Sequence, residues 1–65
     1  MSDLKAPKGK FRIVCVDTFD EIDWVEADVL TLKKAKKIAR KKSGNMLRAY
    51  VYDDQGICHF FSGTY

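Results

Sequence analysis

The sequence predicts a single α+β domain in which four strands form a mainly antiparallel sheet and one helix packs on one face of that sheet. Apolar and polar residues alternate on both sides of a central segment, as they do in strands. Only that central segment, over residues 32–42, has helical periodicity. The chain has 65 residues, which is enough for one small domain. We therefore expect the order β-β-α-β-β over residues 10–65, preceded by a flexible tail over residues 1–9.

The first two strands have the pattern of a β-hairpin. Residues 10–16 are rich in β-branched and aromatic side chains, which favour a mostly buried strand. An acidic turn follows over residues 17–23, and residues 24–30 then alternate strictly. This alternation divides the second strand into a face with Val25, Ala27 and Val29 and a face with Trp24, Glu26 and Asp28.

The helix is predicted from its start signal, its stop signal and its apolar stripe. Thr31 is a favourable N-cap, although Lys34 stands where a Glu would complete a capping box. Ser43 and Gly44 predict the end, with Gly44 in the left-handed conformation. An advance of about 100° per residue gathers the apolar side chains on one arc and the cations on the other. The apolar arc consists of Leu32, Ala35, Ile38 and Ala39.

A second hairpin follows the helix. Residues 46–52 alternate again, residues 53–56 have the composition of a tight turn, and residues 57–61 form the last strand. The residues expected between helix and sheet are Phe11, Ile13, Val25, Ala27, Val29, Leu32, Ala35, Ile38, Ala39, Leu47, Ala49, Val51 and Ile57.

Positive charge is concentrated in the helix. Residues 33–42 hold seven of the twelve Lys and Arg in the chain and no Asp or Glu, and the net charge is +3. Such a face is typical of salt-dependent contact with the phosphates of DNA or RNA. A solvated face, or one balanced by the acidic turns, would have the same composition. The candidate nucleic-acid-binding residues on the helix are Lys33, Lys36, Lys37, Arg40 and Lys41.

The sheet face away from the helix is the second candidate surface, because one helix covers only one face of a sheet. The alternation predicts that Arg12, Trp24, Arg48, Tyr50 and Tyr52 lie on it. Aromatic and Arg side chains on a sheet are typical of platforms that stack single-stranded nucleic acid, but cross-strand aromatic pairs also stabilise sheets without binding anything. We therefore expect a nucleic-acid-binding accessory domain. The alternative is a protein-interaction module, such as a homodimer joined through this face or an edge strand.

Several function classes find no support in the sequence. Cys15 and Cys58 lie in apolar runs, which indicates reduced, at least partly buried thiols of a cytoplasmic protein. With His59 they would supply at most three zinc ligands, and the acidic residues lack calcium-loop spacing. There is no nucleophile with a base and no glycine-rich phosphate loop, so we expect no enzyme, cofactor or metal. No apolar stretch approaches the roughly 20 residues of a membrane span, and we expect no membrane contact.

Several short runs resemble those of small bacterial or phage proteins of β-β-α-β-β pattern. The runs are Val16-Asp17, Asp23-Trp24-Val25, Thr31-Leu32 with Ala35, Met46-Leu47 and Tyr50-Val51-Tyr52-Asp53-Asp54-Gln55-Gly56. The resemblance implies this fold and no particular activity. In those proteins the helix begins T-x-x-E-A, whereas this chain has Lys34 in place of the Glu. The segment with Trp24-Val25 and Thr31-Leu32-Lys33-Lys34-Ala35 also resembles the sheet-plus-helix DNA-binding domains of the plant AP2 type and the phage integrase arm-binding type. Those domains usually have three strands before the helix, whereas this chain has two.

Overall fold

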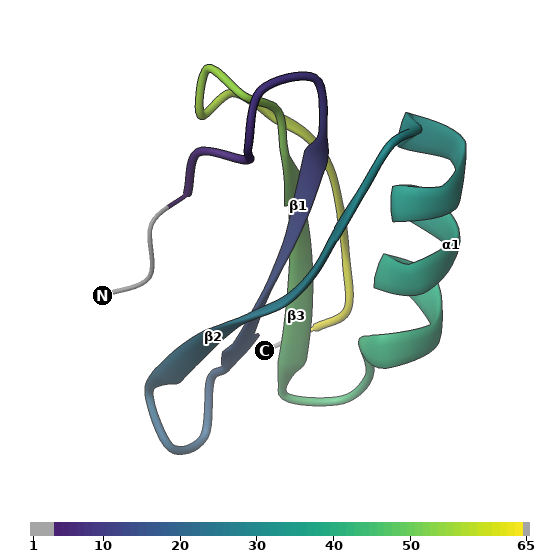
Figure 1. Ribbon diagram of the computed structural model, residues 1–65. Coiled ribbons are helices and arrows are strands. Elements are labelled where there is room, and N and C mark those ends of the chain that lie inside the picture. The colour runs from purple at the N-terminus through teal and green to yellow at the C-terminus, as the bar shows by residue number, and fades with distance from the viewer. Residues whose placement is uncertain (1–3, 65) are drawn as a thin grey trace.

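The computed structural model describes residues 4–64 and contains one sheet and one helix (Figure 1). The elements are β1 (Phe11–Asp17), β2 (Ile22–Val29), α1 (Leu32–Lys42), β3 (Leu47–Tyr52) and β4 (Cys58–Ser62). The strand order is β2-β1-β3-β4, and each neighbouring pair is antiparallel. Helix α1 lies along one face of the sheet (Figure 1). The predicted α+β class and the β-β-α-β-β order are therefore confirmed.

The hydrophobic core lies between α1 and the sheet. Its fully buried members are Ile13, Cys15, Ala35, Ala39, Ala49 and Val51. Partly buried apolar side chains surround them, namely Phe11, Ala27, Val29, Leu32, Ile38, Leu47 and Phe60. The helix contributes two alanines to the buried set, and their small side chains let α1 approach the sheet closely. The predicted core is thus confirmed except at Val25 and Ile57, which are 38% and 59% exposed.

A β-bulge in β2 explains why Val25 leaves the core. Ile13 pairs with Ala27, whereas the next residue of β1, Val14, pairs with Val25. Glu26 is therefore an extra residue in β2, and every side chain before it is on the opposite face from the one that strict alternation predicts. Val25 lies on the face away from α1. Trp24 pairs with the core residue Cys15 and lies on the helix side, so its predicted position on the open face was wrong.

A second bulge interrupts the regular pairing of β3 with β4 near the turn. Val51 pairs with Phe60 and Tyr52 pairs with Cys58, which leaves His59 as the extra residue. Ile57 precedes β4 and closes the turn, where its carbonyl accepts a hydrogen bond from the backbone N–H of Asp53 at 3.0 Å. This turn position, rather than a core position, accounts for the exposure of Ile57.

The N-terminal end of the helix has the expected cap, whereas the C-terminal end differs from the prediction. Thr31 Oγ1 accepts a hydrogen bond from the Lys34 backbone N–H at 3.2 Å, as an N-cap should. At the other end, the Ser43 N–H donates to Ala39 O at 3.0 Å, and Ser43 itself is extended. The left-handed residue of the α1–β3 connection is Met46, with φ of 62°, and not Gly44 as predicted. The chain leaves the helix at Ser43 without a glycine turn and reverses three residues later.

The N-terminal segment lies on the side of the sheet opposite α1 (Figure 1). The Ala6 N–H donates to Asp53 O at 3.0 Å, and the Gly9 N–H donates to Asp54 Oδ2 at 2.9 Å. Ala6 is buried at 6% exposure. Residues 4–9 thus contact the β3–β4 turn, while residues 1–3 of the expected tail lie outside the described residues. The flexibility of the tail stays a prediction.

Candidate nucleic-acid interface

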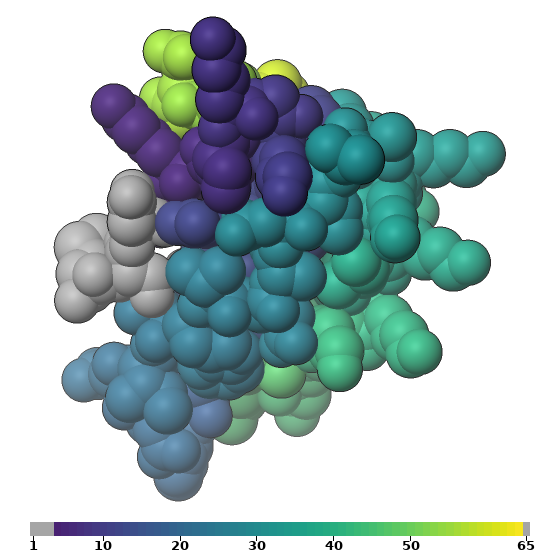
Figure 2. Space-filling model, in the orientation of Figure 1, coloured from purple at the N-terminus to yellow at the C-terminus, as the bar shows by residue number. Residues whose placement is uncertain are grey.

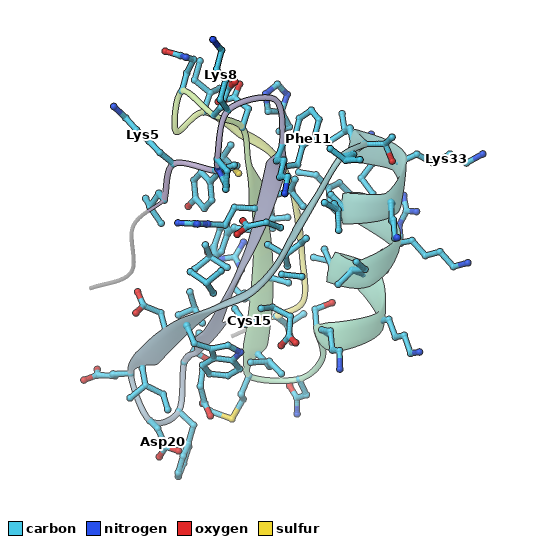
Figure 3. All side chains as sticks on the ribbon, in the orientation of Figure 1. Lys5, Lys8, Phe11, Cys15, Asp20 and Lys33 are labelled. Carbon is cyan, nitrogen blue, oxygen red and sulfur yellow. The ribbon has the colours of Figure 1, made fainter. Side chains whose placement is uncertain are left out.

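Most of the cations of α1 project away from the sheet into solvent (Figures 2 and 3). We define the basic face as five exposed residues that line one shallow groove along the helix: Lys33, Lys34, Lys37, Arg40 and Lys41. The groove also includes Thr31 and the edge of Ile38. Of the predicted helix candidates, Lys33, Lys37, Arg40 and Lys41 therefore belong to one continuous surface.

Acidic side chains do not neutralise this surface. Arg12 pairs with Asp28 and His59 with Asp53, and no cation of α1 forms an ion pair with a residue between 4 and 64. The acidic β1–β2 turn and the C-terminal turn of α1 lie at the same end of the molecule (Figure 1), but no carboxylate there comes within ion-pair distance of a helix cation. The charge of the basic face remains open to solvent.

Lys36 and Arg40 have an additional contact at the β4 side of the helix. Lys36 Nζ lies 5.7 Å from the centroid of the Phe60 ring, and Arg40 Cζ lies 5.1 Å from it. Cation–π contact of this kind holds the two side chains over the edge of the core. Lys36 is half-buried as a result and belongs less to the exposed surface than the sequence predicted, whereas Arg40 remains exposed.

The first-turn part of the basic face is unfavourable for the helix that carries it, whereas Arg40 and Lys41 lie in the last turn, where the helix dipole favours cations. Lys33 and Lys34 occupy the first turn, where the helix dipole is positive and where α1 has no acidic residue. Lys33 and Lys37 are four residues apart, as are Lys37 and Lys41, and like charges at this spacing repel each other by a few tenths of a kcal/mol per pair. Helix stability alone would select acidic residues at several of these positions.

The open face of the sheet holds four of its five predicted residues, and they are engaged with one another or with the fold. Arg12 forms a two-point ion pair with Asp28, with Nε–Oδ1 at 2.8 Å and Nη2–Oδ2 at 3.2 Å. Because Arg12 is half-buried and its charge is matched by Asp28, this cation is poorly placed to recruit phosphate.

Arg48, Tyr50 and Tyr52 form an aromatic cluster with Phe61, a residue that the sequence pattern did not single out. Arg48 Cζ lies 4.5 Å from the Phe61 ring centroid and 5.2 Å from that of Tyr50. Tyr50 stacks on Tyr52 with centroids 6.2 Å apart. Phe61 is 54% exposed. Its position follows from the second hairpin, in which Phe61 pairs with Tyr50, and that pairing was the signal that could have revealed it.

Trp24 lies instead in a small polar cluster on the helix side of β2. Its Nε1–H donates to Glu26 Oε1 at 3.2 Å, and Cys15 Sγ approaches the same oxygen at 3.9 Å. Burial, and then the Glu26 carboxylate, raise the pKa of the Cys15 thiol from 9.0 to about 11, while the positive charge of Lys42 opposes the shift. Figure 3 shows Cys15 between the sheet and α1.

The two cysteines differ, although both are free thiols. Cys15 is buried in the core, as predicted. Cys58 is exposed, so the expectation that it would be partly buried was wrong. It pairs with Tyr52 on the edge strand β4, where no neighbouring strand or helix covers it.

No family model, curated protein or solved structure matches this chain. Among residues 4–64, no three His, Cys, Asp or Glu side chains gather in a way that could hold a metal ion. The same part of the chain contains no helix of the length and apolarity needed to cross a membrane. The choice between the candidate surfaces therefore depends on their charge and geometry.

Proposed function

We propose that this protein binds nucleic acid through the basic face of α1, by contact with phosphates and without reading sequence. The observation that carries the proposal is the unbalanced charge of the helix. Seven of its eleven residues are Lys or Arg, and none of the seven forms an ion pair within residues 4–64. Cations of this kind release the counterions of a nucleic acid when they meet its phosphates, and that release drives binding.

The dimensions of the helix fit a short stretch of nucleic-acid strand. At about 1.5 Å per residue, the eleven residues of α1 span about 16 Å. Successive phosphates of a stacked strand are about 3.4 Å apart along its axis, so this length corresponds to about five nucleotides. Four of the five cations of the basic face are lysines, which contact phosphate as flexible point charges and make few oriented contacts with bases.

The cost of the basic face to the helix supports a binding role over a purely solubilising one. Acidic and basic residues in alternation would keep a helix surface equally well hydrated and would add favourable pairs. This helix carries instead two lysines at its positive end and no acid at all. Lysines that lower the stability of the helix start are more readily explained by an anionic partner that relieves the repulsion.

Charge reversal at the centre of the face tests the proposal. The variant Lys37→Glu with Arg40→Glu should lose binding to a fluorescein-labelled DNA or RNA oligonucleotide in an anisotropy titration. The matched control is Lys5→Glu with Lys8→Glu, which changes the net charge equally but lies on the N-terminal segment, on the other side of the sheet. Retained binding in the helix variant, or equal loss in the control, would contradict the proposal. Circular dichroism would establish that both variants remain folded.

A protein-interaction function is the second candidate, and exposed apolar side chains favour it. Phe61 and Val25 lie on the open sheet face and are 54% and 38% exposed. Burial of this face in a homodimer would remove both from solvent. Light scattering that reports a salt-insensitive dimer, together with no binding of any oligonucleotide, would support this candidate over the first.

A further inference from the structure

The bulge in β2 places the single tryptophan of the chain on the same side of the sheet as the basic helix. Trp24 pairs with Cys15, whose side chain is buried under α1. Without the extra residue Glu26, the indole would lie on the opposite face, as strict alternation predicts. The Trp24 side chain and the cations of α1 therefore belong to one side of the molecule.

Trp24 also lies at the same end of the molecule as the C-terminal turn of α1. The β1–β2 turn is joined to the α1–β3 connection by two hydrogen bonds, in which Thr18 N and Thr18 Oγ1 both donate to Met46 O, at 3.0 and 2.9 Å. A strand that follows the basic face toward its C-terminal end therefore approaches Trp24.

We infer that Trp24 is a base-stacking contact for nucleic acid bound along the basic face, so that the preferred ligand is single-stranded DNA or RNA. The inference rests on the proposed function and specifies its ligand. Trp24 is 36% exposed, and its indole N–H is held by Glu26, which fixes the edge of the ring. A partly exposed aromatic ring on the same side of the molecule as a row of cations is the arrangement with which proteins bind single strands without sequence preference.

The carboxylate of Glu26 determines which part of the ligand meets Trp24. A phosphate at this point would be repelled by Glu26, whereas an uncharged base would not. Phosphates would therefore contact the helix cations, and a base would contact the indole. In a duplex the bases are already stacked and paired, and unstacking one of them costs free energy that a single strand does not have to supply.

The experiment compares three probes of about ten nucleotides, which is within the usual site size for such proteins: single-stranded oligo-dT, an abasic strand of equal length, and a duplex. Because the chain has one Trp, its fluorescence reports directly on Trp24. Oligo-dT should quench this fluorescence. Trp24→Ala should weaken oligo-dT binding by about 5- to 150-fold, the range known for one stacked base. Abasic-strand binding should change less than about twofold, since no base is present to stack.

Trp24→Phe supplies the conservative control, because a phenyl ring can still stack while the hydrogen bond to Glu26 is lost. It should retain most of the affinity for oligo-dT. The inference would be overturned if oligo-dT did not quench the fluorescence of the wild-type protein. It would also be overturned if Trp24→Ala weakened oligo-dT binding and abasic-strand binding equally. The quenching measurement on the wild-type protein remains decisive even if Trp24→Ala does not fold. If the abasic strand and the duplex bind and only the stacking readouts fail, the proposed function stands. If none of the three probes binds, the proposed function itself fails.

Discussion

Replacement of Lys34 by Glu should stabilise the fold and weaken nucleic-acid binding in the same protein. Lys34 is the third residue of α1, and its N–H already donates to Thr31 Oγ1. A Glu at this position completes a capping box, in which its carboxylate accepts a hydrogen bond from the Thr31 N–H. The same change removes a cation from the positive end of the helix dipole and converts the repulsion from Lys37, three residues on, into attraction.

The size of the stability gain follows from these contributions. Removal of an unfavourable charge near the helix N-terminus and addition of a favourable one contribute about 0.3–1 kcal/mol each at low ionic strength. Lys34 is exposed, so the lower part of that range applies to both. With a few tenths of a kcal/mol from the pair with Lys37, the free energy of unfolding should rise by about 1 kcal/mol. For a domain of this size that is an increase in Tm of about 4–8 °C.

Thermal unfolding followed by circular dichroism at low salt measures the stability, and oligonucleotide anisotropy measures binding. Lys34→Gln is the matched control, because Gln can complete the capping box without an added negative charge. It should give intermediate values in both assays. The stability gain of Lys34→Glu should shrink at high salt, as expected for exposed charges. An unchanged or lower Tm at low salt would refute the reasoning that Lys34 lowers helix stability at the start of α1.

Three further predictions concern titratable groups. Because burial raises the pKa of Cys15 to about 11, a thiol reagent at neutral pH should modify Cys58 in the folded protein and Cys15 only after unfolding, and equal rates would show that Cys15 is accessible. The same shift should make the free energy of unfolding fall as the pH rises from about 9 toward 11, since the unfolded chain releases the Cys15 proton first. The hydrogen bond from His59 lowers the pKa of Asp53, so the contribution of Asp53 to stability is present above its unfolded pKa and is lost as the pH falls through its folded pKa. Asp53→Asn should therefore flatten the acid side of the stability curve in urea titrations, and an unchanged acid limb would contradict this assignment.

The helix was predictable from the sequence because its signals are local. Thr31 caps the first turn, Ser43 ends the last one, and the apolar stripe repeats at helical spacing between them. Each of these features acts within a few residues and does not depend on the rest of the chain. The start after Thr31 and the end at Ser43 followed from them, whereas the predicted left-handed Gly44 did not.

The faces of the strands were less predictable, because a bulge is decided by the pairing of two strands. Nothing in residues 24–30 indicates that Glu26 will be left without a partner opposite it on β1. One extra residue was enough to exchange the faces of Trp24 and Val25. His59 is the corresponding extra residue in β4, so Cys58 does not continue the alternation that begins at Phe60.

The residues of the candidate site were also predictable where they depend on local sequence and unpredictable where they depend on strand pairing. The cations of α1 were found from composition and periodicity, and the structure places four of the five candidates on one exposed surface. Phe61 and Glu26 were missed, because the first depends on hairpin register and the second on the bulge. Their roles are visible only when the chain is folded.

The salt dependence of binding to a short single-stranded oligonucleotide tests the central claim most directly. Neutralisation of one phosphate lowers the logarithm of the binding constant by about 0.7 per tenfold rise in salt for a single strand. Five cations on the basic face that each meet a phosphate should therefore give a slope of about −3.5. The account predicts a slope near this value, reduced to about half or less by Lys37→Glu with Arg40→Glu. A slope near zero, or no binding at low salt, would contradict the claim that this helix binds nucleic acid.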